Sequence, residues 1–146
     1  MSAPNKTLHL PATLKAELAA AATRAFPSEC CGLLVGTRSA GTWRVNEIHH
    51  SENLADDKTR AFLIDPTLQF QLLRKFRESS DGVGIVGCYH SHPNGAPAPS
   101  ETDLAEALED GFVWLVMGGA LGPGFAFGAY VYAEKQKAFE ALVFDD

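Results

Sequence analysis

The spacing of apolar residues along this chain predicts helices in three places. The first prediction is a helix of about fifteen residues that begins at Pro11 and ends before Pro27. The second covers residues 66–77, since Asp65 suits an N-cap and a proline follows it. A short third helix is expected after Ser100. The apolar positions expected to face the core in the second and third helices are Leu68, Leu72, Leu73, Phe76, Leu104, Ala107 and Leu108.

Apolar runs between glycines and polar turns predict strands in the rest of the chain. Residues 32–36 and 42–48 are expected to pair as a hairpin, because a short turn joins them. Residues 83–89 are nearly all apolar or small, as in a central strand that is covered on both faces. Residues 49–60 are predicted to form a polar surface loop, and residues 61–64 a short strand. Residues 111–133 are predicted to form two strands around a glycine-rich turn. The tail at residues 135–144 fits either a strand or a helix.

Together these elements predict an α/β (α+β) fold in which helices flank a mixed β-sheet. The chain has 146 residues, which is the size of one ordinary domain with a single core. It contains no internal repeat, low-complexity tract or linker. We therefore expect residues 1–146 to form a single domain.

The composition of the chain disfavours some classes of partner and predicts the cellular compartment of the protein. Eighteen acidic and twelve basic residues give a net charge of −6, so the surface field repels phosphate backbones and disfavours a nucleic-acid partner. Glycines and a proline interrupt the uncharged stretch at residues 111–133, so no membrane partner is expected. The N-terminus lacks a secretory signal, and the three cysteines, Cys30, Cys31 and Cys88, do not resemble a disulfide framework. These features predict a cytoplasmic protein.

Two histidines at the end of the apolar run 83–89 are the strongest chemical signal. Side chains two positions apart in a strand leave on the same face, so His90 and His92 can converge on one metal ion. Asp103 follows eleven residues after His92 across a proline-rich loop and can bring a carboxylate to the same point. Two imidazoles and a carboxylate suit Zn²⁺ and leave its fourth position open for water. This ligand set predicts a catalytic zinc site.

Each of these residues also has a structural interpretation. Taken alone, the pair of His90 and His92 fits a chance pair of solvated or core histidines as well as it fits two metal ligands. Ser100 and Asp103 have the spacing of a helix capping box, in which the aspartate occupies the first turn. Cys88 lies on the same face as His90 and would close the site as a fourth ligand, although a small buried cysteine is the simpler interpretation. Glu29 is a candidate general base, but its position taken alone is typical of a solvated carboxylate at the end of a helix.

The motifs taken together resemble a known family. Pro27 to Gly36 (PSECCGLLVG), His90-Ser91-His92-Pro93 and Pro99-Ser100-x-x-Asp103 are similar to the JAMM motif of the JAMM/MPN (JAB1/MPN/Mov34) zinc metalloprotease family, small prokaryotic type. Other pieces between these motifs share the likeness, namely Asn53, Arg60-Ala61-Phe62, Ile64-Asp65-Pro66 and Gly84-Ile85-Val86-Gly87. The likeness spans about residues 8–132, so we expect the cytidine-deaminase-like MPN/JAMM architecture.

The resemblance implies a role for each site residue. His90, His92 and Asp103 would ligate one Zn²⁺ per chain, Glu29 would accept a proton from the attacking water, and Ser100 would donate a hydrogen bond to the oxyanion. It also implies a zinc-dependent metallopeptidase or isopeptidase that cleaves after the C-terminal tail of a ubiquitin-like or sulfur-carrier protein ending in Gly-Gly. Only Glu109 and Asp110 are expected between the third helix and the next strand, which leaves no room for a long substrate-gripping insertion.

Alternatives to this function remain open at the level of sequence. The main one is a non-catalytic MPN-like binding module or a structural-zinc protein. His90 to Gly95 also resembles a branch of the same superfamily that is associated with DNA repair, which the acidic balance disfavours, and phage tail-assembly peptidases are a further neighbour. The protein substrate, any requirement for a partner and the oligomeric state are not determined by the sequence.

Overall fold

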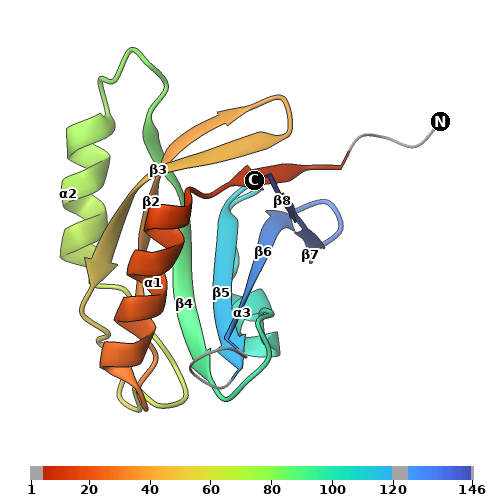
Figure 1. Cartoon of the computed structure of the whole chain (residues 1–146). Coiled ribbons are helices and arrows are strands. Elements are labelled where there is room, and N and C mark those ends of the chain that lie inside the picture. Colours follow the sequence, from red (N-terminus) through yellow and green to blue (C-terminus); the bar gives the residue numbers. More distant parts are fainter. Residues whose placement is uncertain (1–4, 120–124, 146) are drawn as a thin grey trace.

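A computed structural model describes residues 5–119 and 125–145 and has a mixed eight-stranded sheet flanked by helices (Figure 1). The fold class expected from the sequence is thereby confirmed. The elements in chain order are β1 (Thr7–His9), α1 (Ala12–Ala25), β2 (Cys31–Ser39), β3 (Thr42–Ser51), α2 (Pro66–Phe76), β4 (Gly84–Pro93), α3 (Glu101–Glu106), β5 (Val113–Gly119), β6 (Ala126–Ala133), β7 (Ala138–Ala141) and β8 (Val143–Phe144).

The sheet has the strand order β7-β6-β5-β4-β2-β3-β1-β8, with β4 at its centre. β4 pairs antiparallel with β2 and parallel with β5. β7 and β8 occupy opposite ends of this order, yet only Leu142 separates them in the chain. The sheet therefore curls until its two edges lie close together, and the N- and C-terminal strands β1 and β8 are neighbours (Figure 1).

The apolar side chains pack in two clusters, one on each face of the sheet, where the sequence analysis expected a single core. The first cluster lies under α1 and includes Leu18, Leu34 and Tyr89. The second lies under α2 and includes Leu72 and Trp114. A wide sheet that carries helices on both faces must bury both faces, which produces two layers of apolar contacts.

Several strand boundaries differ from the sequence-based predictions. The hairpin at residues 32–48 is confirmed, but β3 continues to Ser51, so the expected polar loop begins later. The strand predicted at residues 61–64 is wrong, because this segment makes only one bridge, between Ile64 and Asn53. The two strands within 111–133 are confirmed as β5 and β6, while the glycine-rich turn at 120–124 lies outside the described residues. The tail forms strands β7 and β8.

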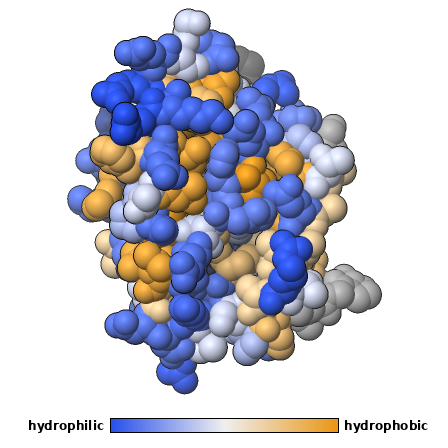
Figure 2. All heavy atoms as spheres, turned by 90° about the vertical axis from the view of Figure 1, so that its left-hand side faces the viewer, coloured by the Kyte–Doolittle hydropathy of each residue, from blue (hydrophilic) through white to orange (hydrophobic). Residues whose placement is uncertain are grey.

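Helix α2 matches its predicted start but not all of its predicted buried positions. Asp65 is the N-cap, and its side chain accepts a hydrogen bond from the backbone N–H of Thr67. Leu72 is buried, whereas Leu73 is 54% exposed and Phe70 is 62% exposed. In the view that faces the α2 side of the molecule, apolar patches lie between hydrophilic areas (Figure 2). The outer face of α2 is therefore partly apolar.

Helix α3 is short and ends at Glu106, earlier than expected. The side chain of Ser100 accepts a hydrogen bond from the N–H of Asp103, and the Asp103 side chain accepts one from the N–H of Ser100, so the predicted capping box is confirmed. Leu104 and Leu108 are exposed rather than buried, and Ala107 alone of the three predicted apolar positions lies in the core. Residues 107–112 connect α3 to β5, which still leaves no long insertion.

The helices in the described part of the chain are short. None of them is both long and apolar enough to cross a membrane.

Candidate metal centre

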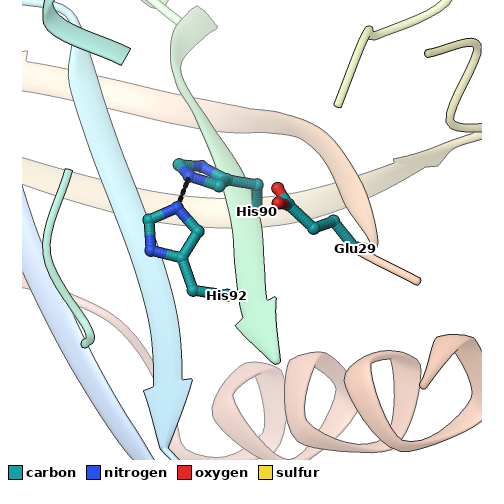
Figure 3. A group of neighbouring side chains, drawn as sticks. All are labelled: Glu29, His90 and His92. Carbon is teal, nitrogen blue, oxygen red and sulfur yellow. Dashed lines mark hydrogen bonds between the residues drawn. The ribbon is translucent and has the colours of Figure 1, made fainter. Parts of the chain in front are cut away.

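Strand β4 carries both histidines of the candidate site. The apolar run at residues 83–89 predicts a strand that ends before both histidines, but β4 continues to Pro93 and holds both side chains in strand geometry. His90 is completely buried, and the His92 side chain is 17% exposed. Their Nε2 atoms face each other at 2.9 Å (Figure 3). The two rings therefore converge on one point, as the i, i+2 spacing predicts.

Asp103 brings a carboxylate to the same point from the first turn of α3. Its Oδ2 atom lies 3.1 Å from His90 Nε2 and 3.5 Å from His92 Nε2. The N–H of Ser100 donates to the same oxygen at 2.8 Å. Burial opposes the charge on this carboxylate, but the hydrogen bonds with His90 and His92 outweigh it and hold the pKa of Asp103 below its usual range. The capping box thus aims an ionised ligand at the histidines.

The other ring nitrogen of each histidine has different surroundings. Nδ1 of His92 lies 3.1 Å from the carbonyl oxygen of Ala96, which can only accept, so Nδ1 carries the proton and Nε2 keeps its lone pair in the neutral ring. Nδ1 of His90 is buried with no hydrogen-bond partner among the described residues. The His90 ring instead stacks on Phe62, with centroids 4.2 Å apart and planes inclined by 19°.

Glu29 is brought to the histidines by the fold, although it lies about sixty residues before them in the sequence. One of its carboxylate oxygens lies within 4.8 Å of the ligand atoms of His90 and His92, and Figure 3 shows the carboxylate pointing toward His90. Glu29 is only 6% exposed, so its interpretation as a solvated carboxylate is wrong. Burial raises its pKa to about 7, against an opposing effect of His92. Glu29 can therefore gain or lose a proton near neutral pH.

These groups open into one cavity of about 320 Å³. Its lining includes Glu29, His92, Ser100 and Asp103, so every candidate site residue except the deeper His90 borders it. The Ser100 hydroxyl accepts from the N–H of Asp103 and keeps its own proton available for a further bond. The remaining wall is formed by Thr59, Arg60, Ala61, Phe62, Pro93, Thr102 and Glu106.

The donor atoms fit a small divalent metal ion. Four ligands at about 2.0–2.1 Å from a tetrahedral Zn²⁺ lie roughly 3.3 Å from one another. The separations among His90 Nε2, His92 Nε2 and Asp103 Oδ2, at 2.9, 3.1 and 3.5 Å, bracket that value. Burial also lowers the pKa of His90, which favours the neutral imidazole that a metal requires. The arrangement is compatible with a metal ion and leaves Glu29 as a second carboxylate beside it.

Cys88 does not take part in this cluster. It is buried in the second core cluster, and burial raises the pKa of its thiol well above the usual range. The interpretation of Cys88 as a small core residue is therefore confirmed. All three cysteines are free thiols.

Sequence reasoning missed two contributions to the site. The stacking of Phe62 on His90 could not be foreseen, because no local pattern connects residue 62 to β4. The role of Asn53 was also missed: its side chain is buried and binds backbone groups of Glu29 and Ala61, two residues that line the cavity. The family resemblance singles out Asn53, but a polar residue within a polar segment gives no indication that its side chain is buried or of the groups that it binds.

Comparison with known proteins decides the family. Residues 11–130 match the model of the prokaryotic homologues of the JAB domain. The chain belongs to this family. The recognition made from the JAMM-type motifs is thereby confirmed, and all five candidate residues of this JAB-domain protein lie inside the matched range.

Three curated proteins are similar to this JAB-domain chain over part of their length. A desampylase from Haloferax volcanii is 37% identical over 90 residues, which cover 62% of each chain. A probable TtuB-protein conjugate cleaving protease from Thermus thermophilus is 31% identical over 100 residues, or 68% of this chain and 63% of the relative. A tail tip assembly protein K of Escherichia phage N15 is 31% identical over 64% of this chain and 33% of its own length. The matched part thus spans less than two thirds of each relative.

Two solved structures share the overall fold of this chain. A solution structure of a protein from Desulfitobacterium hafniense has a TM-score of 0.81, with 24% identity over 95% of this chain and 92% of that one. A second, from Salinibacter ruber, has a TM-score of 0.66, with 30% identity over 96% of this chain and 92% of that one. The first likeness concerns the fold alone.

Proposed function

We propose that this JAB-domain protein is a zinc-dependent metallopeptidase or isopeptidase. The observation that carries the proposal is the convergence of His90 Nε2, His92 Nε2 and Asp103 Oδ2 within 3.5 Å of one another, beside a buried Glu29 with a pKa of about 7. His90, His92 and Asp103 would hold one Zn²⁺ per chain. When bound, zinc supplies Lewis-acid chemistry that polarises a carbonyl group and acidifies water.

Glu29 serves as general base and then as general acid. Its carboxylate borders the cavity and accepts a proton from the attacking water, whose oxygen forms the new bond to the scissile carbonyl carbon. When the C–N bond breaks, Glu29 returns that proton to the departing amine. A pKa of about 7 suits both transfers near neutral pH. One water molecule is thereby divided between the new carboxyl group and the amine.

Ser100 stabilises the negative charge that develops on the carbonyl oxygen. Its hydroxyl accepts from Asp103 and lines the cavity, so its proton can be donated to the substrate. Loss of one such donor typically costs 10²- to 10³-fold in kcat. Because Ser100 also caps α3, its replacement by threonine keeps both functions, whereas alanine loses both.

The proposed substrate is a conjugate of a ubiquitin-like or sulfur-carrier protein, cleaved after its C-terminal Gly-Gly tail. The two relatives named for desampylation and for TtuB-conjugate cleavage support this class of substrate. The short connection at residues 107–112 favours a slender, flexible tail over a large folded linkage. Three free thiols support a reducing cytoplasmic location. We propose no nucleic-acid partner, in keeping with the net charge of −6.

The test is cleavage by zinc-loaded protein of two kinds of conjugate. One is a Gly-Gly-terminated sulfur carrier joined to a lysine side chain, and the other is a linked ubiquitin chain. Cleavage of the first is expected. Cleavage of ubiquitin chains with every sulfur-carrier conjugate left intact would contradict the proposed substrate.

Glu29→Gln separates an enzyme from a binding module. The variant keeps the three zinc ligands, so it should contain as much zinc as the wild type and lose at least about 10²-fold in kcat. His92→Ala, which removes a ligand, should lose the zinc itself. A Glu29→Gln variant with undiminished cleavage would contradict the proposed mechanism, and absence of zinc from the wild type after reconstitution would favour the non-catalytic module.

A further inference from the structure

The peptide segment that carries Glu29 lies outside any regular element. Glu29 and Cys30 fall between α1 and β2, so no helix or strand ladder fixes their backbone. A catalytic base must nevertheless keep its carboxylate in place to within a fraction of an ångström. Other hydrogen bonds to the backbone of Glu29 and Cys30 hold this segment in place.

All four backbone polar groups of Glu29 and Cys30 are bound. The N–H of Glu29 donates to the carbonyl of Lys58 at 2.7 Å, and the carbonyl of Cys30 accepts from the N–H of Ser91 at 3.0 Å. The other two groups are bound by side chains. Asn53 Nδ2 donates to the carbonyl of Glu29 at 3.0 Å, and the Oγ of Ser91 accepts from the N–H of Cys30 at 2.9 Å.

Asn53 connects the Glu29 segment to a second segment of the cavity lining. Its Nδ2 also donates to the carbonyl of Ala61 at 3.0 Å, while its Oδ1 accepts from the N–H groups of Ala55 and Leu63, both at 3.0 Å. An asparagine side chain offers two donor protons and two acceptor positions, and all four are used here. The same amide thus holds Glu29 and the segment around Phe62, the residue that stacks on His90.

Ser91 connects Glu29 to the histidines. It lies between His90 and His92 on β4 and is 2% exposed. Alternation along the strand directs its side chain to the opposite face from the two rings, where it receives the N–H of Cys30. Its hydroxyl therefore ties the segment of the base to the strand of the ligands without touching a ligand atom.

We propose that Asn53 and Ser91 are positioning residues that set the place of the Glu29 carboxylate relative to His90 and His92. This inference rests on the proposed function, in which Glu29 is the base. Asn53 and Ser91 act through the Glu29 peptide and do not contact substrate or metal. Loss of either hydrogen bond leaves a buried peptide group without its partner and lets the segment shift. A displacement of about 1 Å at a catalytic group can cost 10²-fold in rate.

The test compares Asn53→Ala and Ser91→Ala with a control of similar expected instability. Leu72→Ala removes a buried side chain of α2 and serves as the control, and Asn46→Ala, at an exposed position of β3, controls for loss of a surface amide. kcat, KM and zinc per chain are measured on folded, zinc-loaded protein. Amide hydrogen exchange at Ala55, Leu63 and Cys30 reports whether the bonds to Asn53 and Ser91 are lost.

Each of the two positioning variants should lower kcat at least about tenfold, with KM within about twofold and zinc content unchanged. Leu72→Ala and Asn46→Ala should keep the wild-type kcat. The proposal is overturned if either variant retains the kcat of Leu72→Ala, if KM changes instead of kcat, or if activity falls only because zinc is lost. If Asn53→Ala does not fold, Ser91→Ala alone decides the outcome.

Wild-type cleavage is measured first, so that two failures can be told apart. A wild-type protein that cleaves no conjugate contradicts the proposed function and with it the reaction that these residues are proposed to serve. Wild-type cleavage together with fully active variants contradicts the positioning role alone.

Discussion

At the scale of single residues, the surroundings of Glu29 determine its chemistry more than its residue type does. A glutamate at a helix end is ordinarily charged at neutral pH, but this one is 6% exposed, and burial raises its pKa to about 7. Compared with the unfolded chain, the folded protein therefore favours the neutral form of the Glu29 carboxyl group. The neutral carboxyl group of Glu29 therefore contributes to the free energy of unfolding fully below pH 4.5, its ordinary pKa, and this contribution is lost as the pH rises through 7.

This linkage can be measured on metal-free protein by comparing the wild type with Glu29→Gln. Between pH 4.5 and 8 the free energy of unfolding of the wild type should fall relative to that of the glutamine variant, by about 1 to 3 kcal/mol. The glutamine side chain does not ionise, so the difference between the two isolates the carboxyl group from the histidines. Urea denaturation in the presence of a chelator checks it. Parallel stability profiles for the two proteins would show that Glu29 is not buried in the folded state.

Phe62 is a second residue whose role depends on contact rather than on type. Its ring covers His90, whose Nδ1 has no hydrogen-bond partner among the described residues, so stacking holds the ring where a hydrogen bond usually would. Phe62→Ala should weaken zinc binding about tenfold, the lower end of what loss of an outer-shell partner costs. Competition with a chelator measures this. Phe76→Ala, which removes a ring packed against the same core cluster, should leave zinc affinity unchanged, and equal effects of the two would contradict the stacking role.

At the scale of elements, α2 shows how packing selects among similar apolar residues. Leu72 and Leu73 are adjacent and chemically identical, yet Leu72 is 4% exposed and Leu73 is 54% exposed. Successive residues of a helix point about 100° apart, so only one of the two can face the sheet. The sequence alone could not decide how far the buried stripe extends, because the outer face of α2 is also partly apolar.

The difference between these leucines predicts unequal costs of truncation. Leu72→Ala should lower the free energy of unfolding by about 2 to 5 kcal/mol, because it leaves a cavity in the second core cluster. Leu73→Ala should cost less than about 1 kcal/mol, since most of its surface is in contact with solvent. Urea denaturation curves of the two variants check the prediction. Equal costs would place both leucines in the interior.

At the scale of the whole molecule, the proposed metal joins parts that are far apart in the chain. Its candidate ligands come from β4 and α3, and Glu29 comes from the segment before β2. A ligand that binds only the folded protein stabilises it by about 2.7 kcal/mol at a concentration of 100 times Kd. Zinc bound as proposed would therefore couple the integrity of the site to global stability.

Removal of zinc should accordingly lower Tm by several degrees, since 1 kcal/mol corresponds to about 2–4 °C for a chain of roughly this size. Differential scanning calorimetry of zinc-loaded and chelator-treated protein measures the shift. Glu29→Gln should keep it, because all three proposed ligands remain, whereas His92→Ala should lose it. Identical melting of loaded and metal-free wild type would contradict a specific zinc site.

The features that the sequence alone determined are those with short-range physical causes. A strand that carries His90 and His92 on one face follows from the period of two, and the capping box of Ser100 and Asp103 follows from local hydrogen bonding. The start of α2 at Asp65 has the same kind of cause. Each depends on residues only a few positions apart, so spacing is sufficient to predict it.

The tertiary structure decided what depends on contacts between distant segments. It brought Glu29 to the histidines, placed Phe62 against His90, and joined both to Asn53 through one buried amide. It also paired β8 with β1, which lie at opposite ends of the chain. These contacts depend on how the whole sheet curls and packs, and no window of sequence contains that information. Burial then set the pKa of Glu29, because the exclusion of water is a property of the folded molecule and not of the residue.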